Sequence, residues 1–301
     1  MKLLLLFGLL VGWGGPALAD DMEGNAVYLP MPAGESLTVC NPLGTVQLRG
    51  WDQPEVRIVA EKRATSPGLL DRLKVRVEII DGKLDVTAGV YLDGKSWHSV
   101  PLDGAKINLT IDAPRRMALA ASTFAGDIDA AGFRAGAHLS SERGMIRAAD
   151  IEGSVDTRSL DGKQSLQAIH GRLAASGIDG DVELEAIEGD TVDARVYRGQ
   201  ITAREVRTPV VRLQTTIGTI VFVGALRPGG RYELTTYEGD IRLSLRPAPF
   251  RIAARGRSVR TSFAMPDAIA GPGFLRGEFK GGGASLELVS TTGAVAIDRT
   301  E

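Results

Sequence analysis

The chain has a single cysteine among its 301 residues, Cys40, so no intrachain disulfide can form. An exported form of the chain must therefore be stabilised by packing. Cys40 ends a strand-like stretch, residues 37–40, where a small half-buried residue is more typical than a nucleophile. The three histidines, His98, His138 and His170, lie far apart and lack metal-ligand spacing. The sequence thus indicates no metal site and no cofactor.

Aromatic residues are also scarce, at 5% of the chain. The arginines are not interleaved with aromatic side chains, as a protein that stacks single-stranded bases would require. The sequence contains no G-x-S-x-G, nucleotide-binding loop or H-E-x-x-H. The triple glycine at 281–283 lacks the lysine and the helix of a phosphate-binding loop, and is interpreted as a turn. We therefore assign no catalytic residues and expect no nucleic-acid partner.

Long apolar runs are missing as well. Residues 3–13 form an apolar run that is shorter than the roughly 18 residues a membrane span needs. This run follows Met1-Lys2 and precedes Ala17-Leu18-Ala19, the layout of a secretory signal peptide. We expect a signal peptide over residues 1–19, cleavage after Ala19, and a periplasmic or secreted protein with no transmembrane segment after cleavage.

The net charge of −2 hides an uneven distribution. Residues 150–193 hold 11 acids against 3 bases, whereas residues 195–260 hold 13 arginines against 4 acids. A solvated surface with complementary ladders and an electrostatic docking surface both fit this pattern. In the second interpretation, an anionic envelope glycan, a lipid headgroup or an envelope protein would contact the later section. The candidate binding residues are Arg242, Arg246, Arg251, Arg255, Arg257 and Arg260.

Glycine, by contrast, is abundant and regular. It recurs every nine residues at Gly144, Gly153, Gly162, Gly171, Gly180 and Gly189, and then at Gly199 after one inserted residue. An aliphatic residue recurs near each seventh position after the glycine: Ile151, Leu160, Ile169, Ile178, Ile187, Val196 and Val206. Each unit is one strand plus a corner, too short to bury its apolar side alone. The pattern predicts an all-β fold in which residues 119–301 form a parallel β-solenoid (β-helix), with two strands and about 18 to 20 residues per rung.

A rung of eighteen also predicts which outward residues are vertical neighbours. These sets are Lys163–Asp181–Gln200, Ser165–Glu183–Thr202, Gln167–Glu185–Arg204 and Arg172–Asp190. Opposite charges would meet at Lys163–Asp181, Glu185–Arg204 and Arg172–Asp190. The insertion before Gly199 marks where the register relaxes and the charge turns basic, so we expect any functional surface at or beyond it.

Residues 20–118 show the period-two alternation of strands rather than the repeat. The expected strands are 36–40, 45–49, 55–61, 74–79, 83–88 and 106–111. Asp81-Gly82 is a hairpin signal, and residues 68–72 could form one helical turn. We expect this strand-rich section to cap the solenoid, with Trp51 covering the open end; the alternative role for Trp51 is to bind a sugar.

Three stretches together resemble the bacterial putative-adhesin β-strand-repeat family, a domain family of unknown function. Residues 41–52, followed by 56–58, look like its opening strand pair, and residues 107–114 look like the strand that leads into its solenoid. The Gly-Asp-Ile/Val strands at 126–128, 180–182 and 239–241 look like its body. The resemblance covers nearly the whole mature chain. It implies a β-solenoid fold and no known catalytic residues.

These features favour a non-enzymatic, exported β-solenoid that binds a ligand or serves as a structural module of the bacterial cell envelope. The alternative is a carbohydrate-active enzyme that uses the outward row Asp181, Glu183 and Glu185. Successive outward residues on a strand lie about 7 Å apart, within the range of an inverting carboxylate pair. Calcium-binding nonapeptide repeats are not favoured, because they need a paired glycine and a fixed aspartate in each unit.

Overall fold

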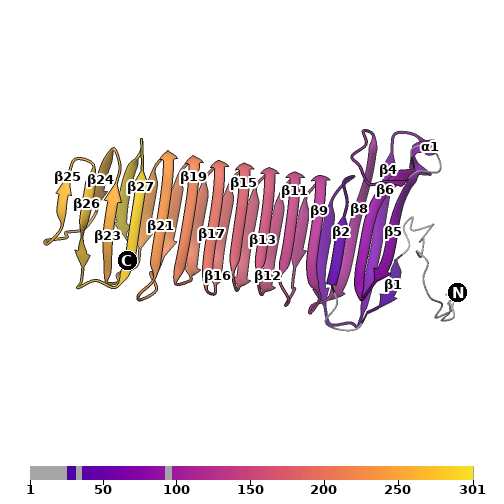
Figure 1. Ribbon diagram of the computed structural model, residues 1–301, viewed down its shortest axis with the longest axis horizontal. Coiled ribbons are helices and arrows are strands. Elements are labelled where there is room, and N and C mark those ends of the chain that lie inside the picture. Colours follow the sequence, from indigo (N-terminus) through magenta and orange to yellow (C-terminus); the bar gives the residue numbers. More distant parts are fainter. Residues whose placement is uncertain (1–25, 32–35, 92–96, 301) are drawn as a thin grey trace.

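The computed structural model describes residues 26–31, 36–91 and 97–300, so the predicted signal peptide lies outside it. The described chain is all-β, as predicted. Its strands form two large sheets, of 13 and 15 strands, that extend along the length of the molecule (Figure 1). The one helix of the described part is the single turn α1 (Pro67–Leu70). None of the described helical structure could cross a lipid bilayer.

The first sheet has the strand order β1 (Val27–Pro30), β4 (Glu55–Ala64), β8 (Ala105–Pro114), β3 (Val46–Trp51), β10 (Ile128–Ala131), β12 (Ile146–Glu152), β14 (Gln164–His170), β16 (Val182–Glu188), β18 (Ile201–Arg207), β20 (Ile220–Gly224), β22 (Ile241–Leu245), β28 (Ala294–Arg299) and β24 (Ser258–Thr261).

The second sheet has the order β25 (Ile269–Gly271), β26 (Phe274–Phe279), β23 (Phe250–Arg255), β27 (Ala284–Ser290), β21 (Arg231–Glu238), β19 (Val210–Ile217), β17 (Thr191–Arg198), β15 (Leu173–Asp179), β13 (Val155–Asp161), β11 (Ala137–Arg143), β9 (Ala118–Ala125), β2 (Ser36–Cys40), β6 (Lys83–Tyr91) and β5 (Leu73–Ile80), with β7 (Trp97–His98) beside β6.

From β9 to β22 the chain alternates between the two sheets, and from β11 onward each strand pairs in parallel with the second strand before it, while β9 pairs with β2 and β10 with β3. One column of Cα partners in the first sheet runs through Ile128, Ile146, Gln164, Val182, Ile201, Ile220 and Ile241. These residue numbers differ by 18, 18, 18, 19, 19 and 21. The large parallel sheets are compatible with the predicted solenoid.

The outward neighbours follow this register. Glu183 pairs with Ser165 and Thr202, and Glu185 pairs with Gln167 and Arg204, as predicted. The ion pairs differ from the prediction, because Lys163 Nζ lies 2.7 Å from Glu183 Oε2 rather than against Asp181. The Asp181 carboxylate is already used, since its Oδ1 accepts the Gln200 backbone N–H at 2.8 Å.

Glycines at the corners allow successive rungs to lie close together. A Cβ built on Gly162 would collide with the carbonyl oxygen of Gly144, and one on Gly180 with that of Gly162. A second glycine column, which includes Gly153 and Gly171, stands at the other corner of the same rungs and is constrained in the same way. Two glycine columns interleaved in one chain produce the nine-residue spacing.

The aspartate of the recurrent Gly-Asp pair links successive rungs. Asp127 Oδ1 accepts the backbone N–H of Met145 at 2.9 Å, and Asp240 Oδ1 accepts that of Ala294 at 3.0 Å. Asp181 does the same with Gln200. A carboxylate that accepts a backbone N–H makes a stronger hydrogen bond than a neutral acceptor. The motif therefore holds together the corner that leads into the first sheet.

The predicted aliphatic column is buried at Ile151, Ile169, Ile187, Val196 and Val206. The expectation is wrong for Leu160 and Ile178, which are 42% and 48% exposed. Both lie next to the last residue of a strand in the second sheet, directly after a position that faces inward, so the column position falls on the outer face.

The expected N-terminal strands all form, and β5 and β6 pair as an antiparallel hairpin around Asp81-Gly82. Trp51, however, does not cover an open end. It ends β3, which lies between β8 and β10 inside the first sheet, while β1 and β4 lie beyond β8. The strands of this section, rather than one indole ring, extend the stack toward its N-terminal end (Figure 1).

Candidate functional site

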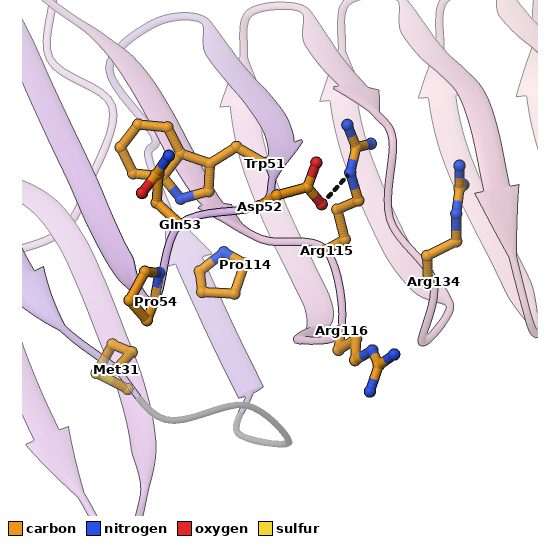
Figure 2. Close-up of a pocket in the computed structure, with 9 residues that line it drawn as sticks. All are labelled: Met31, Trp51, Asp52, Gln53, Pro54, Pro114, Arg115, Arg116 and Arg134. Atoms are coloured by element: carbon orange, nitrogen blue, oxygen red, sulfur yellow. Dashed lines mark hydrogen bonds and ion pairs between the residues drawn. The ribbon is translucent and has the colours of Figure 1, made fainter.

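A pocket of about 400 Å³ opens where β3 and β8 end at one corner of the stack (Figure 2). Its lining residues come from four separate segments: Met31, Trp51, Asp52, Gln53, Pro54, Pro114, Arg115, Arg116 and Arg134. Met31 and Pro114 are buried beneath it, whereas Asp52, Gln53, Pro54 and Arg116 are exposed around it. The pocket thus combines an apolar floor with a polar and largely cationic rim.

Backbone hydrogen bonds hold these segments together. The Arg115 N–H donates to the Trp51 carbonyl at 3.1 Å, and the Arg134 N–H donates to the Arg115 carbonyl at 2.7 Å. On the other side, the Met31 N–H donates to the Pro54 carbonyl at 3.0 Å. Turns of successive rungs therefore lie directly beside one another, which brings residues from 31 to 134 into one site.

The indole of Trp51 is fixed across the turn that it begins. Its Nε1–H donates to the backbone carbonyl of Glu55 at 2.7 Å, and its Cα partner in β8 is Pro114. The side chain is half-buried, so part of the ring remains accessible. A tryptophan whose N–H is already satisfied offers its ring, rather than a donor, to a ligand.

Two of the three guanidinium groups have carboxylate partners. Arg115 Nε lies 2.9 Å from Asp52 Oδ1, and Arg134 lies 3.0 Å from Asp150 Oδ2 and 3.1 Å from Glu152 Oε1. The side-chain hydrogen bond to Asp150 raises the pKa of Arg134 above its usual value, so this group stays cationic.

Arg116 differs from the other two arginines. It is exposed on the rim, and no carboxylate among the described residues forms an ion pair with it. Its planar guanidinium can bind a carboxylate, sulfate or phosphate through two parallel hydrogen bonds. A rim guanidinium without an ion-pair partner among the described residues, in a pocket that also has an apolar floor and an accessible indole, suits a ring-shaped ligand that carries an anionic group.

The six sequence-predicted arginines are exposed but do not lie together. Arg242 and Arg260 lie on the first sheet, each paired in register with Ala296 of β28. Arg251 and Arg255 lie on β23 of the second sheet, and Arg246 and Arg257 lie in the turns that follow β22 and β23.

Three of these six arginines are engaged in ion pairs. The partners are Asp240 for Arg242, Glu205 for Arg246 and Glu278 for Arg251. Within the described ranges, Arg255, Arg257 and Arg260 form no ion pair. The later section therefore offers separate cationic positions on two faces.

The acidic row on β16 faces outward, as the alternation predicts, while Val182 and Leu184 are buried. Glu183 forms the ion pair with Lys163, and Asp181 accepts the N–H of Gln200. These two carboxylates therefore have structural partners between rungs. In the described part of the chain, no cluster of three His, Cys, Asp or Glu side chains could hold a metal ion.

Sequence reasoning missed most of the corner pocket. Trp51 was interpreted as a cap, and Arg115, Arg116 and Arg134 drew no prediction. One signal was available, because the Arg115-Arg116 pair directly follows the Pro114 that ends a predicted strand. The position of Arg134 beside this pair is set by the register between rungs.

No protein-family model matches the chain, and no curated protein matches it. Solved structures that it is similar to include a putative adhesin from Parabacteroides merdae ATCC 43184, at 12% identity and a TM-score of 0.45 over 93% of this chain and 97% of that one. A putative adhesin from Bacteroides fragilis NCTC 9343 is also 12% identical, with a TM-score of 0.41 and coverage of 93% and 99%. A putative lipid binding protein from Parabacteroides distasonis ATCC 8503 is 9% identical, with a TM-score of 0.30 and coverage of 93% and 97%.

Proposed function

We propose that this chain is an exported, non-enzymatic binding protein of the bacterial cell envelope. Residues 119–301 form a parallel β-solenoid of about 18 to 20 residues per rung, and residues 20–118 cap it. The steps of 18 and 19 between Cα partners from β10 to β20 support this rung length. Export rests on the signal-peptide layout of residues 1–19.

The observation that carries the binding role is the corner pocket. It joins an accessible indole, Trp51, to a guanidinium without a carboxylate partner among the described residues, that of Arg116. We propose that the pocket binds an acidic sugar unit of an envelope glycan, with the ring over the apolar floor and the anionic group at Arg116. Neighbouring rungs then extend the contact along the polymer.

Substitution of Arg116 tests this proposal. Affinity of the purified protein for a panel of acidic polysaccharides is measured by calorimetry at two salt concentrations. We expect Arg116→Gln to weaken the affinity about tenfold, which is the scale of one charge-assisted contact, and to reduce its salt dependence. Arg204→Gln is the matched control, because Arg204 is also exposed and lies on another part of the first sheet. Equal affinity of the Arg116 variant and the parent protein would refute the pocket's role.

The six arginines of the later section remain a proposed second contact for the same polymer. Arg255, Arg257 and Arg260 are the ones to replace together, since they have no ion-pair partner within the described ranges.

The same panel of acidic polysaccharides, incubated with the protein and scored for new reducing ends or unsaturated products, tests the non-enzymatic role. Turnover that Glu183→Gln abolishes would show that the chain is an enzyme.

A further inference from the structure

The exposed large apolar side chains of the repeat body are not scattered. Between residues 101 and 260 they are Leu160, Ile178, Tyr197 and Tyr237, with exposed fractions of 42%, 48%, 50% and 59%. All four lie near the ends of strands in the second sheet, namely β13, β15, β17 and β21. Isolated exposed apolar residues are common, but a contiguous row of them marks an interaction site.

The register places these side chains in one line across the sheet. Gly177 pairs with Ser159 and Val196, and Asp179 pairs with Asp161 and Arg198. The residues between these partners, Leu160, Ile178 and Tyr197, are therefore neighbours on successive strands. Thr216 and Tyr237 continue the line on β19 and β21 by the same reasoning. We call these five residues, of which all but the half-buried Thr216 are large and apolar, the apolar column. It spans four strand spacings, or about 19 Å.

The column leads into a hollow toward the C-terminal end of the sheet. The Tyr237 carbonyl accepts the backbone N–H of Thr292 at 3.1 Å. The preceding residue, Thr291, lines a hollow of about 1070 Å³ together with the exposed side chains of Ile269 and Phe274. Exposed apolar side chains thus occur on strands of the second sheet from β13 to β26, with Thr216 and Thr291 between them.

Unlike the apolar column, the hollow is lined by cationic side chains. Arg255 and Arg276 line it, and neither forms an ion pair within the described part of the chain. The one carboxylate among its lining residues is that of Glu287. A ligand that follows the column would therefore reach two guanidinium groups at its C-terminal end.

The shape of the surface limits what can occupy it. The column is one residue wide, too narrow for the roughly 800 Å² per partner of a stable protein interface. It lies on the face of paired strands, so an added β-strand would find no free backbone groups there. A single linear apolar chain with one anionic end matches both the width and the charge.

We propose that the apolar column and the hollow bind one anionic lipid. Its acyl chain lies across β13 to β21, and its headgroup lies at Arg255 and Arg276. The proposal extends the envelope role proposed above to a second ligand, whose site lies on the second sheet and shares only Arg255 with the later-section arginines. It gives a role to apolar side chains at positions that the backbone of the second sheet turns outward.

Calorimetry with lysophosphatidylglycerol below its critical micelle concentration tests the proposal. We expect saturable binding of one lipid per chain. We expect the double variant Tyr197→Ser/Tyr237→Ser to weaken it at least tenfold, because each half-exposed ring that is fully buried contributes on the order of one tenfold step in affinity. Ile79→Ser is the matched control, since Ile79 is 54% exposed but lies on β5 at the N-terminal end.

The headgroup contact is tested separately. Arg255→Gln/Arg276→Gln should remove the preference for lysophosphatidylglycerol over the zwitterionic lysophosphatidylcholine and leave the affinity for the latter unchanged. Arg204→Gln should change neither. Absence of binding to monomeric lipid would overturn the proposal, as would binding only to vesicles of phosphatidylglycerol or equal effects of the Tyr and Ile79 variants. If polysaccharide binding still depended on Arg116, the proposed function would stand and only the lipid site would fail.

Discussion

In the first sheet the aliphatic residue that follows the corner glycine by seven positions is buried, whereas on β13 and β15 of the second sheet the same position faces solvent. Ile169 and Ile187 are 0% exposed, but Leu160 and Ile178 are 42% and 48% exposed. The four residues belong to neighbouring rungs and occupy the same place in the nine-residue repeat. Their different burial must therefore come from the backbone of the two sheets.

The backbone differs at one residue. In the first sheet a left-handed residue stands just before the aliphatic one, with φ between 50° and 53° at Asp150, Ala168, Ala186 and Glu205. This residue interrupts the alternation of the strand and turns the next side chain inward. The strands β13, β15 and β17 contain no such residue, so their alternation continues and the next side chain points outward.

The comparison separates positions that the core requires from surface positions that packing does not constrain. In the first sheet the aliphatic residue belongs to the core. In the second sheet an inward residue, such as Ser159 before Leu160 or Val196 before Tyr197, directly precedes the exposed one, so the outward position is not constrained by packing. An apolar residue at this outward position is explained by an interaction outside the chain, which is the basis of the lipid proposal.

Truncation of one isoleucine in each sheet gives the largest expected contrast. Ile187→Ala should lower the free energy of unfolding by about 2–5 kcal/mol, because it leaves a cavity in the core. Ile178→Ala should change it by less than about 1 kcal/mol, because the side chain is already half in water. Urea unfolding followed by circular dichroism measures both. Equal losses would show that the two sheets do not differ as described.

Much of this fold was predictable from the sequence, because period-two alternation and glycine spacing are local signals. They predicted the strands β2 to β6 and β8 and the outward pairing of Glu183 and Glu185. The left-handed conformation of Ala168 and Ala186 was not predictable, because alanine carries no preference for it. The corner pocket was missed for another reason, since the register between rungs decides which turns stand side by side.

Glycine substitutions test the left-handed residue directly, with a smaller expected effect. Ala186→Gly should raise the free energy of unfolding by about 1 kcal/mol, because glycine adopts a positive φ without steric cost. Ala175→Gly, in an extended and buried position of β15, should lower it by about 1 kcal/mol. The same change thus has opposite signs in the two sheets. A loss of stability at both positions would contradict the role given to Ala186.

The smallest expected effect concerns the corner that leads into the first sheet, where the Gly-Asp aspartates accept backbone N–H groups of the next rung. The hydrogen bond from the Ala294 N–H, together with Arg242 and Arg257, lowers the pKa of Asp240 below its usual value of 3.8. A lowered pKa in the folded state means that the ionised carboxylate stabilises the fold above about pH 4 and that this contribution is lost as the pH falls further. Asp240→Ala should therefore lower the melting temperature slightly at pH 6, and the difference from the parent protein should shrink toward pH 2.

Asp190→Ala, at the corner that leads into the second sheet, is the control, because no hydrogen bond of its side chain to the next rung is present in the described structure. A melting-temperature difference for Asp240→Ala that stayed constant from pH 6 to pH 2 would mean that the carboxylate charge does not stabilise this corner.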